Sequence, residues 1–344
     1  MKYIELPTYT LNIVRAAKSM SMKEKPAPHP GKGQVRIRIR YAPCNPSDIS
    51  FIQGRYGFQK PLPATPGFEG MGTVIETGEG TESLDGKRVS CFSQYESGGT
   101  WSEEFITSAS NCIPLKDDMP DEQASCFAIN PFTAYALFHR VKNRHQAVIL
   151  NAAGGQVSRL FAALACEAGI EIIKIVRKTE VDTGSGDEQR HVINQHDADF
   201  LPRLKALASS LNATIALDAV GGNMTGDMLN NMPAGSQVIV YGGLSGKPLG
   251  NIHILEIVFG NKTITGFDLN QWIGSLAKDE FHDISQKLQE MFIRKKLTTK
   301  IQGIYPLGNF EKGLFRYIKN MSAGKILFSP VIDPGVRTGP PPQV

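Results

Sequence analysis

The stretch AVILNAAGGQVSRLFAALACEAGIEIIKIV (147–176) decides the fold of this chain. It opens with a short apolar run (147–151), turns at two glycines, and continues through residues 158–169, where apolar side chains recur at helical intervals. A second apolar run, IEIIKIV (170–176), follows at once. A strand, a helix and a second strand in this order predict two parallel strands joined by a crossover helix.

Further apolar runs extend this unit in both directions. TIALDAVGG (214–222) and QVIVYGG (237–243) each end in paired glycines, and KTITGF (262–267) is a candidate fifth strand. Upstream, the apolar residues of 121–141 have helical spacing. Strands that alternate with helices predict a doubly wound parallel sheet of the Rossmann kind, and we assign it residues 126–267.

The first 125 residues have a different pattern, with short strands and many turns. QVRIRIRYA (34–42) alternates branched and basic residues, and GMGTVIETG (70–78) and GKRVSCF (86–92) are short runs bounded by glycine. The Pro- and Gly-rich stretch 43–70 between them predicts a loop. This pattern predicts a compact β domain, built as a partly open barrel.

Length and composition fit two hydrophobic cores in a soluble protein. The chain has 344 residues, 41% hydrophobic and 20% charged, which is more than one core usually organises. Residues 268–344 are too few for a core of their own, so we place them with residues 1–125 in one domain. The net charge of +4 argues against a nucleic-acid binder. No signal peptide or membrane-spanning run is visible, and five cysteines form no CxxC pair, so we expect a cytoplasmic protein without a membrane partner.

The glycine turn inside 147–176 is a candidate phosphate-binding site. In G-x-G-x-x-G units, glycines let the backbone approach a pyrophosphate at a helix N-terminus. Ser158 stands here in the position of the last glycine, so the motif alone equally fits a glycine-rich turn of any α/β domain. The strand before it, the helix after it and two more strands that end in Gly-Gly favour a dinucleotide site.

The residues after the second predicted strand indicate which dinucleotide binds. An Asp or Glu at this point would bind the ribose 2′-hydroxyl of NAD and repel a 2′-phosphate. This chain has Arg177, Lys178 and Thr179 instead. Arginine can form a bidentate pair with a phosphate, and lysine adds positive charge. We therefore predict NADPH as the cofactor, with ordinary solvated surface cations as the alternative.

With these features, the chain resembles the medium-chain dehydrogenase/reductase superfamily over residues 30–330. The resemblance implies a chaperonin-10-like β domain interrupted by a Rossmann domain. Many members hold zinc with Cys and His. At the first two ligand positions this chain has Asn45 and Phe68, and the region of the third ligand, 129–133, contains no Cys. Because phenylalanine has no donor atom for a metal, we predict that no zinc is bound.

Among zinc-free members, the sequence is most similar to the mitochondrial-type 2-enoyl thioester reductases, and next to the quinone oxidoreductases. NPSDISFIQGRYG (45–57) resembles the stretch around the proton-donating tyrosine of the enoyl reductases, which corresponds to Tyr56. Other similar segments are NPFTAY (130–135), YGGL (241–244), GFDLNQW (266–272) and Lys325. In this last segment Asp268 stands where that group has Trp.

The resemblance assigns roles to individual residues. It implies that Tyr56 is catalytic and that Phe58 and Trp272 line the substrate pocket. Together with the glycine turn and the cations after the second strand, it implies cofactor contacts from Asn45, Asn130, Thr133, Gly154, Gly155, Gln156, Val157, Arg177, Lys178, Thr179, Tyr241, Gly242, Gly243, Leu244, Phe267, Asp268, Leu269 and Lys325.

The implied reaction is the NADPH-dependent reduction of the 2,3 double bond of an enoyl thioester, carried by coenzyme A or acyl carrier protein. Hydride would reach the β-carbon, and Tyr56 would donate a proton to the α-carbon. One alternative is an NADPH:quinone or alkenal reductase, which needs no Tyr56 because a reduced quinone takes protons from water. Another is an NADPH-binding protein without catalysis. The family further implies a homodimer.

Overall fold

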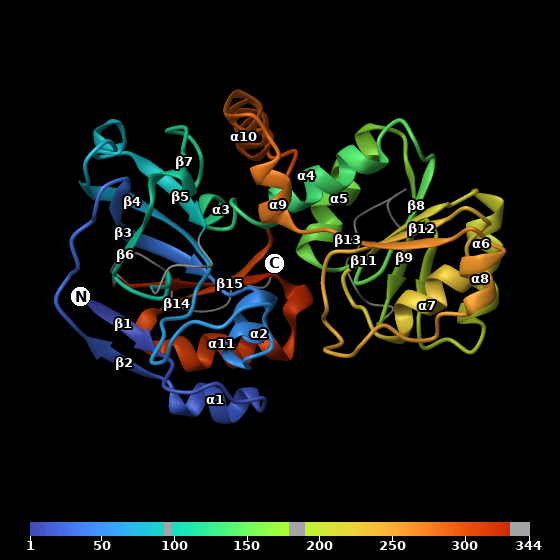
Figure 1. Ribbon diagram of the computed structural model, residues 1–344, viewed down its shortest axis with the longest axis horizontal. Coiled ribbons are helices and arrows are strands. Elements are labelled where there is room, and N and C mark those ends of the chain that lie inside the picture. The colour runs from blue at the N-terminus through green and yellow to red at the C-terminus, as the bar shows by residue number, and fades with distance from the viewer. Residues whose placement is uncertain (93–97, 179–189, 331–344) are drawn as a thin grey trace, which may run out of the picture. The chain divides into compact units, whose positions relative to one another are not determined.

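The computed structural model describes residues 1–92, 98–178 and 190–330, and the chain divides into two compact units (Figure 1). Unit 1 contains Met1–Asn130 and the chain from His282 onward, and unit 2 contains Pro131–Phe281. The sequence predicts that the inserted domain ends at residue 267. In the structure unit 2 continues to Phe281, whose ring stacks on Phe132 with the ring centroids 5.2 Å apart.

Unit 2 is built on a parallel sheet. Within the described residues this sheet has six strands in the order β10-β9-β8-β11-β12-β13. In order along the chain this is 3-2-1-4-5-6, the doubly wound order in which ligands bind where strands 1 and 4 meet. The strands are β8 (Ala147–Leu150), β9 (Glu171–Val176), β10 (Val192–Asn194), β11 (Ile215–Asp218), β12 (Gln237–Val240) and β13 (Thr263–Gly266). The predicted Rossmann sheet is confirmed, and the three-residue β10 is the strand that the sequence did not reveal.

The helices of unit 2 connect these strands and supply apolar faces to their core. For example, α5 buries Leu160, Phe161 and Leu164, which lie three to four residues apart. The helical spacing over 121–141 corresponds to two helices, Asp121–Ser125 and Asn130–Val141, because Pro131 cannot sit inside a helix and instead occupies the first turn of the second one. The helices are α4 (Asn130–Val141), α5 (Gln156–Glu167), α6 (Phe200–Ser210), α7 (Asn223–Asn230), α8 (Ile254–Val258) and α9 (Leu269–Gly274).

Unit 1 is a mainly antiparallel β domain, as predicted. Its described residues form a seven-stranded sheet in the order β14-β15-β3-β4-β5-β7, with β6 paired to β3. The strand β15 comes from the C-terminal part of the chain and pairs antiparallel with the end of β3. The strands are β3 (Gln34–Pro43), β4 (Glu69–Thr77), β5 (Arg88–Phe92), β6 (Glu104–Ser108), β7 (Cys112–Pro114), β14 (Ile301–Pro306) and β15 (Lys325–Ser329), and β1 (Lys2–Glu5) pairs with β2 (Ser21–Glu24) in a separate sheet.

A short helix in unit 1 corrects the prediction of a continuous loop over 43–70. Pro46 occupies the first turn of α2 (Pro46–Ile52), and the side chain of Asp48 accepts the backbone N–H of Asn45, so the first turn is capped. The other helices of unit 1 are α1 (Ile13–Ser19), α3 (Asp121–Ser125) and α11 (Phe310–Lys319), while α10 (Lys278–Ile293) begins in unit 2 and ends in unit 1. Among the described residues, no helix is long and apolar enough to cross a membrane.

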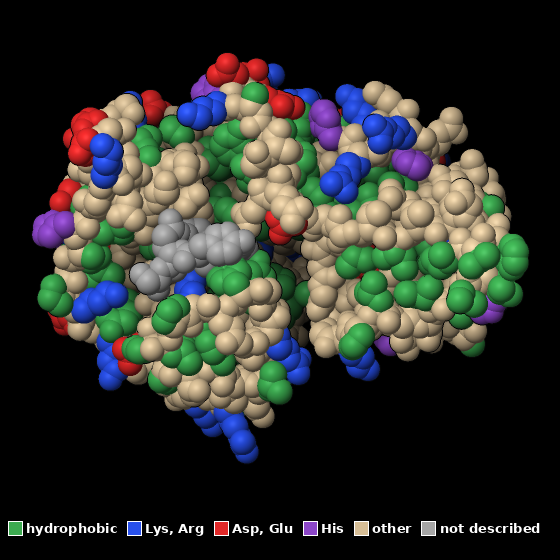
Figure 2. Space-filling model, in the orientation of Figure 1, with side chains coloured by type: hydrophobic (Ala, Val, Ile, Leu, Met, Phe, Trp, Pro, Cys, Tyr) green, Lys and Arg blue, Asp and Glu red, His purple; other side chains and the backbone are tan. Residues whose placement is uncertain are grey.

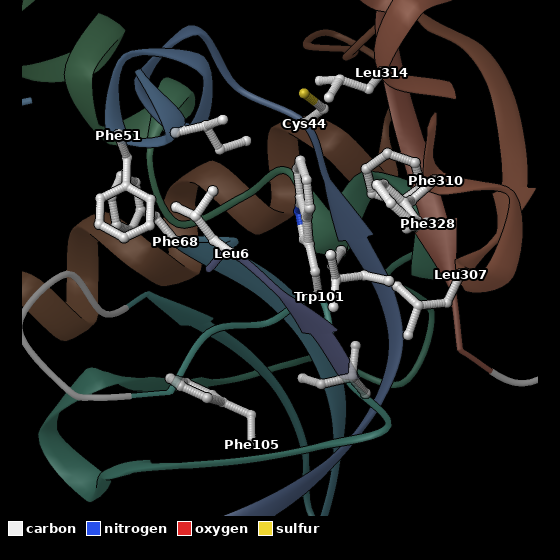
Figure 3. Close-up of a cluster of buried hydrophobic side chains, with 14 of the residues drawn as sticks. Leu6, Cys44, Phe51, Phe68, Trp101, Phe105, Leu307, Phe310, Leu314 and Phe328 are labelled. Carbon is white, nitrogen blue, oxygen red and sulfur yellow. The ribbon is translucent and has the colours of Figure 1, made fainter. Parts of the chain in front are cut away.

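The core of unit 1 is organised around Trp101 (Figure 3). Its ring lies 4.7 Å from that of Phe328 between centroids, and its indole N–H donates to the carbonyl of Pro43 at 3.2 Å. Phe51 and Phe68 pack edge to face at 5.3 Å within the same cluster. Side chains from both parts of the chain therefore share one core, which is why the C-terminal segment belongs to unit 1.

Candidate active site

The first strand and helix of the unit 2 sheet meet in a tight turn that ends in glycine. β8 ends at Leu150, and Gly155 is the N-cap residue of α5. A Cβ atom on Gly155 would lie 3.0 Å from the carbonyl oxygen of Ala152, closer than almost all such contacts. Gly155 itself places no side chain at the start of α5, and a glycine turn before a helix N-terminus is a typical phosphate-binding arrangement.

Two buried polar side chains, Asn151 and Asp218, join the carboxyl ends of β8 and β11, where the strand order reverses. Asn151 Nδ2 donates to Asp218 Oδ1 at 2.5 Å, and the backbone N–H groups of Val220 and Gly221 donate to the same oxygen at 2.8 and 2.9 Å. The hydroxyl of Thr225 donates to Oδ2 at 2.5 Å. Sequence reasoning missed this pair, although each is the polar residue that ends an apolar strand.

The loop after β12 lies close to the loop that follows β11. A Cβ atom on Gly242 would lie 2.8 Å from the carbonyl oxygen of Ala219, so this position needs glycine. The hydroxyl of Tyr241 lies 3.4 Å from Ser158 Oγ. Burial raises the pKa of Tyr241 to about 12, so the phenol stays protonated. Ser158, which replaces the last glycine of the motif, thus contacts the predicted cofactor residue Tyr241.

Arg177 and Lys178 follow β9 directly, and both side chains are exposed. In a parallel sheet the carboxyl ends of all strands lie at one edge, so these cations share an edge with the turn before α5. Thr179 lies outside the described residues. The edge combines a helix N-terminus, two glycines at which a Cβ atom would lie within 3.0 Å of a carbonyl oxygen, and two cations, and these features fit the phosphates of a nicotinamide dinucleotide.

The predicted residues after β13 form the start of α9. Asp268 is the N-cap residue, and its side chain accepts the backbone N–H three residues further on, at 2.7 Å. The guanidinium of Arg140 lies 5.1 Å from the centre of the Phe267 ring. Trp272 is half-buried within α9. The carboxylate that replaces the family's tryptophan therefore caps a helix, and contacts of these residues with cofactor or substrate stay predictions.

The predicted catalytic residue, Tyr56, lies in unit 1 on a group of aromatic side chains. Its half-buried ring has its centroid 5.2 Å from that of Phe58 and 5.0 Å from that of Phe68. The buried Lys60 lies beside the same group, with Nζ 5.5 Å from the Phe68 centroid and donating to the carbonyl of Gly98 at 2.5 Å. Aromatic packing on Phe58 and Phe68 therefore contributes to holding the ring of Tyr56.

Asn45 lies at the centre of a buried polar cluster in unit 1. Its backbone N–H donates to Asp48 Oδ2 at 2.7 Å, and its Nδ2 donates to Glu69 Oε1 at 2.9 Å. From β15, Lys325 donates through Nζ to Asn45 Oδ1. All four residues are buried. The structure thus brings together two predicted cofactor residues, Asn45 and Lys325, with Asp48 and Glu69, the acids nearest the matched motifs, for which the sequence favoured turn capping over a chemical role.

The comparisons with known proteins agree with this architecture. A family model for the alcohol dehydrogenase GroES-like domain matches residues 31–117. The mitochondrial enoyl-acyl-carrier-protein reductase of Xenopus tropicalis is 30% identical over 285 residues, covering 79% of this chain and 80% of the relative. This chain belongs to the medium-chain dehydrogenase/reductase superfamily. The Bos taurus relative of the same name is 29% identical over 279 residues, covering 78% of this chain and 74% of the relative.

A solved structure of the same superfamily matches almost the whole chain. It is a protein from Mesorhizobium loti assigned as an NADPH:quinone reductase, 30% identical, with a TM-score of 0.88 and coverage of 96% of this chain and 98% of that one. The predicted superfamily and fold class are therefore confirmed, and the chain is a member of a superfamily of nicotinamide-dependent oxidoreductases. The two relatives named as enoyl reductases and the protein assigned as a quinone reductase are each 29% or 30% identical to this chain, so sequence identity does not separate the two branches.

At the positions where zinc-using members of this superfamily carry their first two metal ligands, this chain has Asn45 and Phe68, and both side chains contact other side chains of the protein. Phe68 is fully buried against Phe51 and Tyr56, and Asn45 contacts Glu69 and Lys325. In the described part of the chain, no three His, Cys, Asp or Glu side chains are grouped so as to hold a metal ion.

Burial shifts the two carboxyl groups of the unit 1 cluster in the same direction. Desolvation raises the pKa of Asp48 from 3.8 to about 7 and that of Glu69 from 4.5 to about 7, although the Lys325 ammonium lowers both. Between the unfolded and folded pKa values, the folded state holds more protons than the unfolded state. Stability is therefore expected to be greatest below about pH 4 to 5 for these groups and to fall as the pH rises through about 7.

This expectation can be measured by denaturant unfolding at several pH values from 5 to 8. Each proton held only by the folded state contributes a slope of about 1.4 kcal/mol per pH unit. The variants Asp48→Asn and Glu69→Gln should each flatten the decline seen in the parent protein, since each removes one titrating group. An equal slope in the parent and both variants would show that these carboxyls are ionised throughout.

Proposed function

We propose that this protein is an NADPH-dependent reductase of 2-enoyl thioesters. The observation that carries the proposal is the placement of Tyr56, whose phenol ring packs on Phe68 at a position where zinc-using members need a metal ligand. The residues at the first two zinc-ligand positions, Asn45 and Phe68, favour an acceptor that is already electrophilic, and a double bond conjugated to a thioester carbonyl is such an acceptor. Relatives named mitochondrial enoyl-acyl-carrier-protein reductases support this choice.

In this proposal, residues of unit 2 bind the cofactor and Tyr56 of unit 1 donates the proton. When bound, a nicotinamide dinucleotide supplies hydride, and the glycine turn before α5 with Arg177 would hold its phosphates. Tyr56 Oη would donate the proton that the α-carbon of the resulting enolate needs. A phenol with an ordinary pKa of ~10 stays protonated at neutral pH and can still protonate the more basic enolate.

The direct test measures NADPH oxidation with a panel of acceptors. Crotonyl-coenzyme A and longer enoyl thioesters, on coenzyme A and on acyl carrier protein, are compared with quinones and alkenals, with and without prior dialysis against a chelator. We expect turnover of the thioesters that dialysis leaves unchanged. Turnover of quinones alone would overturn the proposal, and loss of activity on dialysis would reveal a metal in the reaction.

The second candidate is an NADPH:quinone reductase, which the 30% identity to the Mesorhizobium loti protein favours. The two functions differ in their need for an acid. A hydroquinone takes its protons from water, whereas the enolate carbon needs a placed donor. A quinone reductase would therefore keep its quinone turnover when the hydroxyl of Tyr56 is removed.

Replacing Arg177 with Ala is expected to weaken NADPH binding selectively. Hydrogen bonds to a charged group contribute about 1.5–3 kcal/mol, so KM for NADPH should rise about 10- to 100-fold while KM for NADH changes little. Arg203→Ala is the matched control, because Arg203 is another exposed arginine of unit 2, paired with Asp197 at 3.3 Å. Equal rises for NADPH and NADH would exclude a 2′-phosphate contact.

We further propose that the protein forms a homodimer through β13 and α8. β13 is the last strand of its sheet, and in the described residues its paired neighbour is β12. Figure 2 shows a band of hydrophobic side chains on unit 2 in this region. The exposed apolar side chains in and around α8, between 37% and 80% exposed, are Leu249, Ile252, Ile254, Leu255, Ile257, Val258 and Phe259.

A two-fold axis beside β13 would pair this edge with its copy and cover the apolar side chains. Sedimentation equilibrium should give the mass of a dimer for the parent and of a monomer for Phe259→Asp. A parent protein that sediments as a monomer at micromolar concentration would contradict this arrangement.

A further inference from the structure

Three segments of unit 1 that are far apart in the sequence meet at the buried polar cluster. They are the start of α2 at Asn45, the start of β4 at Phe68 and Glu69, and Ile129 just before α4. The backbone N–H of Phe68 donates to Asp48 Oδ1 at 3.1 Å, and that of Ile129 donates to Glu69 Oε2 at 3.1 Å. These segments are the ones in which zinc-using members of the superfamily carry their metal ligands.

The cluster contains titratable groups whose charged forms are costly when buried unless they are paired. The side chains of Asp48 and Glu69 are completely buried. Removing a carboxylate from water costs several kcal/mol, so each needs a nearby cation and several hydrogen bonds. Lys325 Nζ donates to Asn45 Oδ1, whose Nδ2 in turn donates to Glu69, and the ammonium lowers the pKa of both carboxyls.

The other titratable groups that face the cluster fit this arrangement. The Lys60 ammonium also acts on Asp48. Burial raises the pKa of Cys44, Cys126 and Tyr317, so these three stay neutral. Lys325 Nζ lies 5.9 Å from the centre of the Tyr317 ring. Among the described residues that act on Asp48 and Glu69, two ammonium groups therefore face the two carboxyl groups.

We propose that Lys325 is an internal cation that joins these three segments, as a bound metal joins them in zinc-using relatives. In this role Lys325 is a positioning residue that acts through Asn45 and Glu69. Asn45 begins the segment that carries Tyr56, and Ile129 precedes the predicted cofactor residue Asn130, so the cluster fixes the ends of both segments. The catalytic part of this inference rests on the proposed function, while the structural part does not.

The test compares three variants: Lys325→Met, which removes the charge, Glu69→Gln, and the double variant. Lys262→Met is the matched control, because Lys262 is a buried lysine of unit 2 whose Nζ donates to the carbonyls of Leu229 and Met232 at 2.8 and 2.6 Å. Amide hydrogen exchange is measured in peptides that cover 44–57 and 126–131, together with kcat for crotonyl-coenzyme A and KM for NADPH.

We expect Lys325→Met to speed exchange in both peptides and to lower kcat, each by about tenfold or more, because it removes the cation that acts on Glu69 and leaves Asp48 with Lys60 alone. The double variant should recover much of both losses, since it restores the charge balance. Lys262→Met should leave exchange in the two peptides unchanged.

Two results would overturn the inference. One is exchange in both peptides that stays at the parent rate in Lys325→Met. The other is a rise in KM for NADPH with no recovery in the double variant, which would assign Lys325 to direct cofactor contact. If the parent protein has no enoyl reductase activity, the exchange measurements still decide the structural role, and the failure then lies in the proposed function alone.

Discussion

Replacing Tyr56 with Phe is expected to lower turnover of a crotonyl thioester by about 10²–10⁴-fold, the usual size of general acid catalysis. The variant keeps the ring that packs on Phe58 and Phe68 and removes only the hydroxyl. The enolate then has no placed proton donor and must take its proton from water. Stopped-flow or steady-state oxidation of NADPH measures the change, and KM for NADPH should stay within a few-fold of the parent value.

Because Tyr56→Phe removes only one hydroxyl group, a change in turnover reports on that group. Tyr305→Phe, which removes a hydroxyl from a half-buried tyrosine of β14 in the same unit, is the control for general effects and should keep full activity. Quinone turnover by Tyr56→Phe, measured in parallel, should be nearly that of the parent. Crotonyl thioester turnover within a few-fold of the parent would remove Tyr56 from the mechanism.

Replacing Asp218 with Ala is expected to destabilise unit 2 by about 3–5 kcal/mol, because it leaves several buried donors without an acceptor. The side chain of Asn151, two backbone N–H groups and the hydroxyl of Thr225 all donate to this carboxylate. These groups join the ends of β8 and β11, so NADPH binding should weaken as well. Urea unfolding with and without NADPH measures both effects.

Asp227→Ala provides the control for the loss of a carboxylate in the same unit. Asp227 is only half-buried, and its Oδ1 accepts one side-chain hydrogen bond, from Asn251 at 2.9 Å. Its loss should cost less than about 1 kcal/mol, as is usual for a partly exposed polar contact. Similar losses for both variants would mean that the buried network contributes no more than a surface hydrogen bond.

Local patterns in the sequence were sufficient for the architecture of unit 2. The apolar runs of β8, β9, β11 and β12 alternate with helical spacing, and this alternation admits few arrangements other than a parallel sheet with crossover helices. The runs are informative because strands buried on both faces must be apolar along their whole length. The β13 strand, with exposed residues at both ends, had a weaker pattern for the same reason.

In unit 1, local sequence patterns were not sufficient to predict the structure. The Pro- and Gly-rich stretch 43–70 predicts a loop, yet α2 forms within it because Pro46 fits a first helical turn and Asp48 caps the N-terminus. The packing of Tyr56 on Phe68 joins residues twelve positions apart through a loop, with no periodic signal. Family resemblance identified Tyr56, but its aromatic surroundings appear only in three dimensions.

The amino-acid order by itself determined that the chain folds as a Rossmann unit inserted in a β domain, since hydrophobic periodicity and glycine turns act over a few neighbouring residues. Only the tertiary structure decided that Lys325 meets Asn45, 280 positions earlier in the chain, and that Asn151 meets Asp218. Such contacts depend on which strands become neighbours. The charge state of each buried carboxyl depends in turn on which donors and cations the fold places around it.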